Sequence, residues 1–236
     1  MCARYGADTV RLYMLFAAPP EKDLEWSDAG IEGTSRFLNK VYRLVAKHTE
    51  RLRGVKTWAS GDVASALSTE ERRLLRKTHQ ALRHVTADLE ERWHYNTDIA
   101  MMMELVNEIV DLEGAVAEGK IRPEGLKAAV ECLLVMLSPF APHVADELWE
   151  ALGHEQPLLR TAWPAFNAEL AAEEELEIPV QVNGKLRGRV RVPAGAAEEE
   201  IRRRALAEEK VMALVEGKQI VKLIVVPQKL VNIVVK

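Results

Sequence analysis

Five cations form one row along a predicted helix near the N-terminus. The intervals between them are four, three, four and four residues, and the members are Arg36, Lys40, Arg43, Lys47 and Arg51. At about 100° per residue, this spacing predicts a stripe about 80° wide on one side of the helix. Such a row is suited to binding the phosphates of a nucleic-acid backbone, and an ordinary solvated face is the alternative.

A second set of cations follows the pattern of a β-hairpin. In "IPVQVNGKLRGRVRVP", Asn183-Gly184 separates two segments of alternating residues, which is the strongest short hairpin signal. Four cations of the second segment alternate with mostly apolar residues, namely Lys185, Arg187, Arg189 and Arg191. We therefore expect one basic face, which can lie on a sugar-phosphate backbone, and one apolar face packed on helices.

Catalytic and metal-binding motifs are not found. The sequence has no phosphate-binding glycine loop, dinucleotide fingerprint, HExxH zinc motif or GxSxG nucleophile elbow. Carboxylates such as Glu70 and Glu71 are expected on solvated helix surfaces. His143 and Glu147 are one helical turn apart, but no second His or Cys nearby completes a ligand set. We predict no catalytic residue and no metal site.

The cationic row depends on a helical array between about residues 6 and 153. Apolar residues recur there at intervals of three and four, with Gly and Pro between the runs, which predicts about six helices. Starts are expected at Ser27 or Asp28, at Ser68 with Glu71 as a capping box, at Asn96 and at Pro123. The side of the second long helix opposite the cations is apolar, with Phe37, Leu38, Val41, Tyr42, Leu44 and Val45.

The segment "SPFAPHVADELWE", residues 138–150, predicts a corner between two helices. Its two prolines cannot lie inside one continuous helix, and an amphipathic pattern follows them. We expect Phe140 and Trp149 in the core. His143 is interpreted as a capping or packing residue.

The charge of the chain divides it into an acidic body and a basic tail. Its 236 residues, 48% of them hydrophobic, can bury one large core or two modest ones. From Ile178 onward there are 12 Lys and Arg against 6 Asp and Glu, a net charge of +6, which leaves −10 for the remainder. A basic appendage of this kind favours an anionic partner.

The domain prediction follows from these patterns. We expect a multidomain, mainly α chain with a helical bundle at 1–165, an acidic tether at 166–177 and a small β-β-α-β-β domain at 178–236. The second hairpin of that domain is expected to turn near Pro227-Gln228. The sequence shows no long apolar run and no leader, so we expect a cytoplasmic protein with no membrane partner. We also expect a monomer. Cys2 and Cys132 are interpreted as plain thiols.

The chain resembles the bacterial-type leucyl-tRNA synthetases of class I. "RYGADTVRLYMLFAAPPEKDLEWSDAGIEGTSRFLNKVYRLV" is similar to the segment that enters the helical domain of that family. "YNTDIAMMMELVN" and "LSPFAPHVADELW" resemble later helices of it, and "PVQVNGKLRGRVRVP" resembles the start of the C-terminal domain. The "LEWSDAGIEGTSRFL" portion resembles the leucine enzymes more than the related valine, isoleucine or methionine enzymes.

This resemblance implies a fold and a function. The fold is an anticodon-binding-type helical bundle followed by a small α+β domain, and the chain is expected to be the C-terminal part of an enzyme that ligates leucine to its tRNA with ATP and magnesium. The HIGH and KMSKS motifs of that family do not occur between Met1 and Lys236. The piece alone is therefore expected to be inactive and to need no cofactor.

The partner that the resemblance implies is leucine tRNA, with no DNA. The bundle would hold the tRNA stem and inner corner, and the small domain would hold the elbow. The residues expected to contact tRNA are Arg36, Lys40, Arg43, Lys47, Lys185, Arg187, Arg189 and Arg191. The alternative is a helical scaffold that binds protein helices, with an incidental basic tail, and it predicts a contiguous apolar groove on the bundle.

Overall fold

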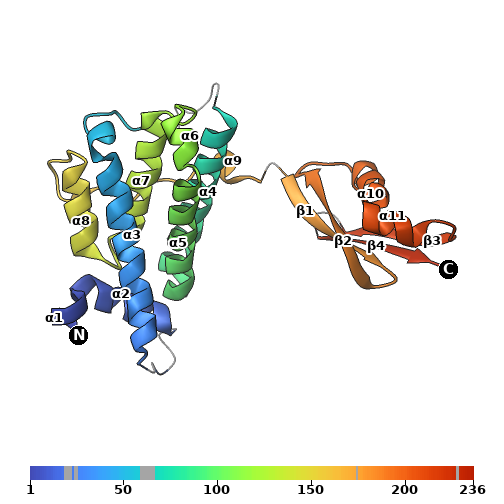
Figure 1. The fold of residues 1–236 in the computed structure, drawn as a ribbon, viewed down its shortest axis with the longest axis horizontal. Helices are drawn as coiled ribbons and strands as arrows, with labels where there is room; N and C mark the ends of the chain where they lie inside the picture. Colours follow the sequence, from blue (N-terminus) through green and yellow to red (C-terminus); the bar gives the residue numbers. More distant parts are fainter. Residues whose placement is uncertain (19–22, 24–25, 59–66, 174, 227–228) are drawn as a thin grey trace. The chain divides into compact units, whose positions relative to one another are not determined.

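The chain folds into two compact units. The computed structural model describes residues 1–18, 23, 26–58, 67–173, 175–226 and 229–236. The units are Met1–Ala172 and Glu173–Lys236. Figure 1 shows the first as a helical bundle and the second as a small sheet with helices packed on it. The predicted fold class, mainly helical with a small α+β domain, is confirmed.

The first unit is built from helices. Its elements are α1 (Cys2–Tyr5), α2 (Ala7–Ala17), α3 (Asp28–Leu52), α4 (Thr69–Ala87), the π-helical turn η1 (Asp88–Arg92), α5 (Tyr95–Asp111), α6 (Glu113–Ala117), α7 (Pro123–Leu137), α8 (Pro142–Ala151), the 3₁₀ turn η2 (Leu158–Arg160) and α9 (Ala168–Ala171). α4 packs against α5, α7 and α9, and α3 packs against α2, α7 and α8. The described helices include none that is both long enough and apolar enough to span a membrane.

Side chains that bind free backbone N–H groups fix the starts of α3 and α4. Ser27 Oγ accepts a hydrogen bond from the backbone N–H of Gly30 at 3.2 Å. On α4, Ser68 Oγ accepts from the N–H of Glu71, and the Glu71 carboxylate accepts from the N–H of Ser68, each at 3.0 Å. The predicted start of α3 and the predicted capping box are both confirmed.

Two further helix starts were predicted, and one of them is wrong. Pro123 occupies the first turn of α7, as expected. α5 begins at Tyr95 rather than after Asn96, and His94 precedes its first residue. The reason lies in the preceding turn, because Trp93 ends η1 in a left-handed conformation with φ 57°. His94 follows in a non-helical conformation, and α5 begins at Tyr95.

Residues 138–150 form the predicted corner between α7 and α8. Phe140 and Trp149 belong to the bundle core, with 1% and 6% of their surface exposed. Asp8 of α2 caps α8 by accepting a hydrogen bond from the N–H of Val144 at 2.7 Å. His143 lies at the surface, with Nδ1 2.7 Å from the same carboxylate. The corner is structural, and His143 supports the capping carboxylate instead of capping the helix itself.

The apolar side of α3 faces the core with one exception. Phe37, Val41 and Val45 are buried, but Tyr42 is 43% exposed. Its hydroxyl donates a hydrogen bond to Glu147 of α8 at 3.2 Å. The amphipathic ring of tyrosine suits such a boundary position, with its polar end in solvent.

The second unit is a four-stranded sheet with strand order β2-β1-β4-β3. The strands are β1 (Glu175–Val182), β2 (Lys185–Pro193), β3 (Ile220–Val226) and β4 (Leu230–Val235). β1 pairs with β2 and β3 with β4 in antiparallel fashion, while β1 and β4 are parallel. Asn183 and Gly184 have φ of 50° and 78°, as a two-residue Asn-Gly turn requires. The turn predicted near Pro227-Gln228 lies outside the described residues.

The helical stretch of this unit is divided in two. α10 (Glu198–Ala207) and α11 (Glu209–Val215) meet at Glu208, whose side chain accepts a hydrogen bond from the N–H of Val211 at 2.8 Å. Both helices pack against the sheet. Their buried partners on the strands include Ile178, Val180 and Val192.

The segment expected to be an acidic tether, residues 166–177, is partly folded. α9 lies within it and packs on α4, where Gln80 donates a hydrogen bond to the carbonyl of Ala171 at 3.0 Å. Asn167 caps α9, and β1 begins at Glu175. Half of its twelve residues are polar, and Ala171 is the one buried residue among those that the structure describes, so no apolar face could be recognised.

Candidate nucleic-acid interface

The cationic row of α3 lies on the side of the helix away from the core. Arg36, Arg43, Lys47 and Arg51 are exposed, and Lys40 is half-buried. Arg36 and Arg43 make no hydrogen bond or ion pair with the residues that the structure describes. Two guanidinium groups, two helical turns apart, are therefore available to an anionic ligand.

The other members of the row have partners within the bundle. Lys40 Nζ donates a hydrogen bond to Asn107 of α5 at 2.5 Å. Lys47 forms an ion pair with Glu113, and Arg51 donates to the carbonyl of Val116 at 2.9 Å. These contacts fix the outer edge of α3 against α5 and α6.

The ion pair with Glu113 reduces the positive potential that Lys47 presents to a ligand. Burial alone would raise the pKa of Glu113, but hydrogen bonds from Lys47 and His48, with their charges, lower it below the ordinary value. Glu113 is therefore ionised at neutral pH and partly neutralises Lys47. The strongest positive potential along the row is expected at Arg36 and Arg43.

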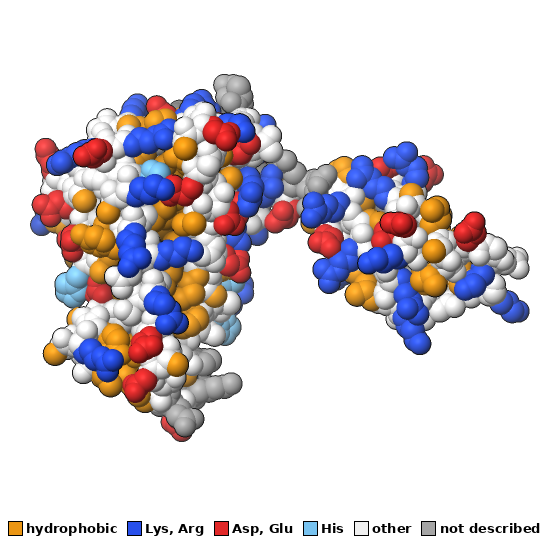
Figure 2. All heavy atoms as spheres, in the orientation of Figure 1, with side chains coloured by type: hydrophobic (Ala, Val, Ile, Leu, Met, Phe, Trp, Pro, Cys, Tyr) orange, Lys and Arg blue, Asp and Glu red, His pale blue; other side chains and the backbone are white. Residues whose placement is uncertain are grey.

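A groove beside α3 brings these groups together. Its volume is about 550 Å³, and its lining consists of Arg36, Asn39, Lys40, Arg43, Leu44, Lys47, Val110 and Glu113. Figure 2 shows Lys and Arg side chains gathered over α3, with apolar side chains between them. Guanidinium groups at such a surface can bind phosphate oxygens with two parallel hydrogen bonds. The groove is open to solvent.

The second predicted set of cations lies on β2. Lys185, Arg187, Arg189 and Arg191 are all exposed. Arg189 and Arg191 pair with Pro179 and Glu177 of β1, on the face opposite the buried valines. Arg189 also lies 3.5 Å from the Glu177 carboxylate, so one acidic group reduces the charge of this face.

A bulge corrects the prediction of one continuous basic face. Val180 pairs with Gly188 and Gln181 pairs with Leu186, which leaves Arg187 as the extra residue. On the turn side of the bulge, odd-numbered and even-numbered residues of β2 exchange faces. Leu186 therefore lies on the same face of the sheet as Gln181, the face that carries Arg189 and Arg191. Leu186 is 53% exposed. The alternating pattern therefore holds only for Arg189 and Arg191, with an exposed apolar residue at the end of the strand.

The sequence reasoning missed the polar members of the groove. Asn39 lies one helical turn from both Arg36 and Arg43, and helical spacing alone could have included it. Glu113 and Asn107 come from other helices, and no local signal connects them to α3. Their contribution depends on how the helices pack.

Comparison with known proteins places the chain in a family. A family profile described as "Anticodon-binding domain of tRNA ligase" matches residues 71–202, more than half of the chain. The chain belongs to this family. The match covers α4 to α8 of the bundle and continues into α10.

Two leucine-tRNA ligases are similar to this chain along nearly its whole length. The leucine-tRNA ligase of Geotalea daltonii is 50% identical over 236 residues, covering 98% of this chain and 27% of that protein. The leucine-tRNA ligase of Syntrophobacter fumaroxidans is 46% identical, covering 100% of this chain and 28% of that protein. The chain therefore spans little more than a quarter of the length of these relatives.

A solved structure is similar to the chain at the level of the fold. It is described as the ternary complex of Agrobacterium radiobacter K84 agnB2 LeuRS, tRNA and LeuAMS. Its TM-score is 0.84 at 32% identity, and the match covers 100% of this chain and 30% of that one.

Proposed function

We propose that this chain binds tRNA as part of a leucine-tRNA ligase. The observation that carries the proposal is the pair Arg36 and Arg43, whose guanidinium groups have no partner among the described residues. They line the groove between α3 and helices that match an anticodon-binding domain. The similarity to a synthetase solved together with tRNA supports it.

The proposed contacts are mainly with phosphates. Arg36, Lys40, Arg43 and Lys47 on α3 would position the RNA backbone, with the two arginines making the strongest contacts. On the sheet, Arg189 and Arg191 would serve the same purpose, with Lys185 and Arg187 at its edge. Backbone contacts of this kind supply affinity and orientation but little sequence information.

The complete ligase would join leucine to leucine tRNA with ATP and magnesium. That chemistry needs groups that stabilise the charge of the ATP phosphates, and the HIGH and KMSKS motifs that supply them in this family do not occur in the chain. We expect the 236-residue chain alone to give no leucine-dependent pyrophosphate exchange. We further propose a monomer that works in the cytoplasm and binds neither DNA nor membranes.

The alternative function, a scaffold for protein helices, predicts an apolar groove on the bundle. The groove beside α3 is lined by four cations and two further polar side chains. Such a lining favours an anionic ligand over the apolar face of a helix.

The test is direct titration of the chain with fluorescent leucine tRNA. Binding should weaken by about 10- to 1000-fold between 50 and 200 mM salt if a few phosphates are contacted. A duplex DNA of equal charge is the control, and tRNA should bind more tightly because its folded shape fits the groove. Binding that is independent of salt, or equal for tRNA and DNA, would contradict the proposal.

A further inference from the structure

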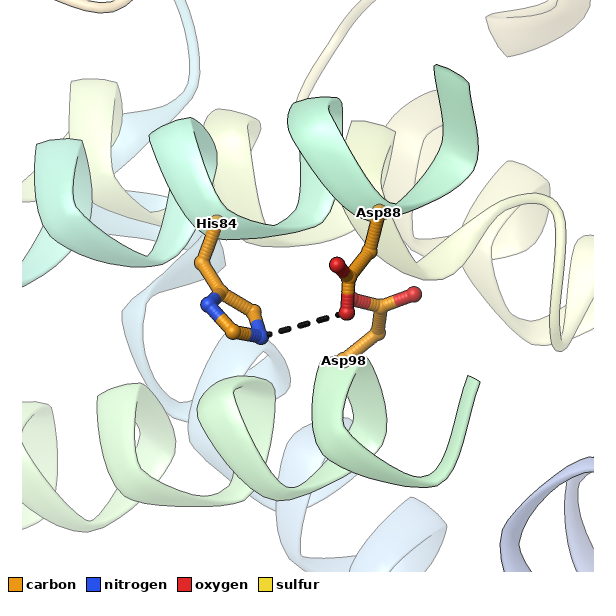
Figure 3. A group of neighbouring side chains, drawn as sticks. All are labelled: His84, Asp88 and Asp98. Carbon is orange, nitrogen blue, oxygen red and sulfur yellow. Dashed lines mark ion pairs between the residues drawn. The ribbon is translucent and has the colours of Figure 1, made fainter. Parts of the chain in front are cut away.

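Three ligand-type side chains meet between α4 and α5, away from the cationic groove. Figure 3 shows His84 and Asp88 pointing from α4 and η1 toward Asp98 of α5. One ligand atom from each residue lies within 4.8 Å of the other two. Among the described residues, they are the one such group that could hold a metal ion.

The polar atoms of this cluster lack the partners that buried groups normally have. Asp98 is fully buried, and neither of its carboxylate oxygens has a hydrogen-bond partner among the described residues. The same is true of Asp88 Oδ1 and His84 Nε2. His84 Nε2 lies 3.4 Å from Asp88 Oδ2, a contact without hydrogen-bond geometry. A buried carboxylate with no donor at either oxygen is costly unless a ligand satisfies it.

The cluster is also short of positive charge. Among the described residues, the arginine that pairs with the cluster is Arg92, whose Nε lies 3.7 Å from Asp88 Oδ1 and whose side chain is 55% exposed. A divalent cation between the two carboxylates would balance both charges.

We propose that His84, Asp88 and Asp98 bind one divalent transition-metal ion, of which Zn²⁺ is the best-matched example. One imidazole nitrogen and two carboxylate oxygens are common zinc ligands, while the imidazole disfavours Mg²⁺ and Ca²⁺. Tetrahedral bonds of about 2.1 Å place ligand atoms about 3.4 Å apart, so small side-chain rotations would bring the three side chains onto one ion, with a water molecule as the fourth ligand. Neutral His84 would bind through Nε2 and carry its proton on Nδ1.

The position of the site suggests a structural role. Asp88 begins η1 and Asp98 lies in the first turn of α5, so a bound ion would connect the two helices across the intervening turn. The side chain of His84 is 33% exposed, although its Nε2 atom is buried with the carboxylates. Metal binding would then stabilise the end of the α4–α5 pair.

The test is zinc binding by the 236-residue chain, treated with chelator and free of any histidine tag. Equilibrium dialysis should give one Zn²⁺ per chain. At free zinc about 100 times Kd, the melting temperature should rise by about 5–10 °C. Co²⁺ should give the visible absorption of a tetrahedral site, and excess Mg²⁺ should not displace either ion.

Variants distinguish this site from adventitious binding. H84N and D98N should each weaken zinc binding by at least about 10-fold, since both remove a direct ligand. H143N is the matched control, because it changes another histidine beside a carboxylate, Asp8, and should leave zinc binding intact. Circular dichroism checks that each variant is folded.

Two results would overturn the proposal. The first is the lack of a zinc-dependent rise in melting temperature, which would mean that a proton or water occupies the cluster. The second is zinc binding that H84N and D98N leave unchanged, which would place the ion elsewhere on the chain.

Discussion

Glu71 binds Arg122 with both of its carboxylate oxygens. Oε1 accepts hydrogen bonds from the Arg122 backbone N–H at 2.9 Å and from Nε at 2.7 Å, and Oε2 accepts from Nη2 at 3.0 Å. Oε2 also completes the capping box with Ser68. Glu71 is 2% exposed, although it was expected on a solvated surface. One carboxylate thus joins the start of α4 to the start of α7.

Replacing Glu71 should destabilise the bundle in a pH-dependent way. Burial raises the pKa of this carboxyl, but the hydrogen bonds from Arg122 and Ser68 outweigh it, so the pKa lies below the ordinary 4.5. Its stabilising effect is therefore complete above that value and is lost as the pH falls through the folded-state pKa. Glu71→Gln should cost about 2–3 kcal/mol at pH 7, measured by urea unfolding, and progressively less in acid.

Glu70→Gln is the control for that experiment. It removes the same charge from the same helical turn, so the loss of helix-dipole stabilisation alone should cost under about 1 kcal/mol. Equal losses for the two variants at pH 7 would show that the Arg122 contacts contribute nothing.

Two glycines of α3 should respond to alanine in opposite directions. At Gly30 a Cβ atom would lie 2.7 Å from Cε2 of Tyr13, which is 2% exposed and held through its hydroxyl by the N–H of Ser27. Gly30→Ala should therefore destabilise the bundle by about 1–3 kcal/mol. At Gly33 the nearest atom is 3.9 Å away, at the end of Arg36.

Gly33→Ala should stabilise the bundle by about 0.5–1 kcal/mol, because alanine favours the helix and nothing obstructs it. Thermal unfolding of both variants beside the unaltered chain is the measurement. If Gly30→Ala is as stable as Gly33→Ala, then Tyr13 moves freely and the packing argument is wrong.

Local signals account for much of what the sequence predicted. The Ser68 capping box, Pro123 in the first turn of α7 and the Asn183-Gly184 turn each depend on a few neighbouring residues. The physical cause of each feature lies within a few consecutive residues, so each can be predicted from the sequence. The start of α5 was misplaced because Trp93 adopts a left-handed conformation that no nearby glycine announced.

The parts of the candidate sites that were missed depend on contacts between distant residues. Glu113 and Lys47 are 66 residues apart in the chain, and Asp98 meets His84 only because α4 and α5 pack together. The bulge that leaves Arg187 unpaired is set by the register of β1 on β2. Periodicity identifies the face of one helix or strand, but not which residue of another element faces it.

Removing the second unit should separate two activities of the proposed ligase. Deletion of residues 173–236 from the complete enzyme should impair charging of leucine tRNA, because that step would use the cations of β2. Leucine-dependent pyrophosphate exchange should be nearly unchanged, since it requires no tRNA contact. An equal fall in both activities would indicate that the unit supports the catalytic fold instead.

The salt dependence of tRNA binding tests the central claim most directly. In one triple variant, Arg36, Lys40 and Arg43 become Gln. In the control triple variant, three exposed cations outside α3 become Gln instead, namely Lys56, Arg83 and Arg160, so the change in charge is the same. The first variant should bind leucine tRNA more weakly, with the slope of log K against log salt reduced by up to about 0.9 for each lost phosphate contact. The control variant should keep most of the slope. An unchanged slope in the first variant, or equal reductions in both, would mean that the row on α3 is only a solvated face.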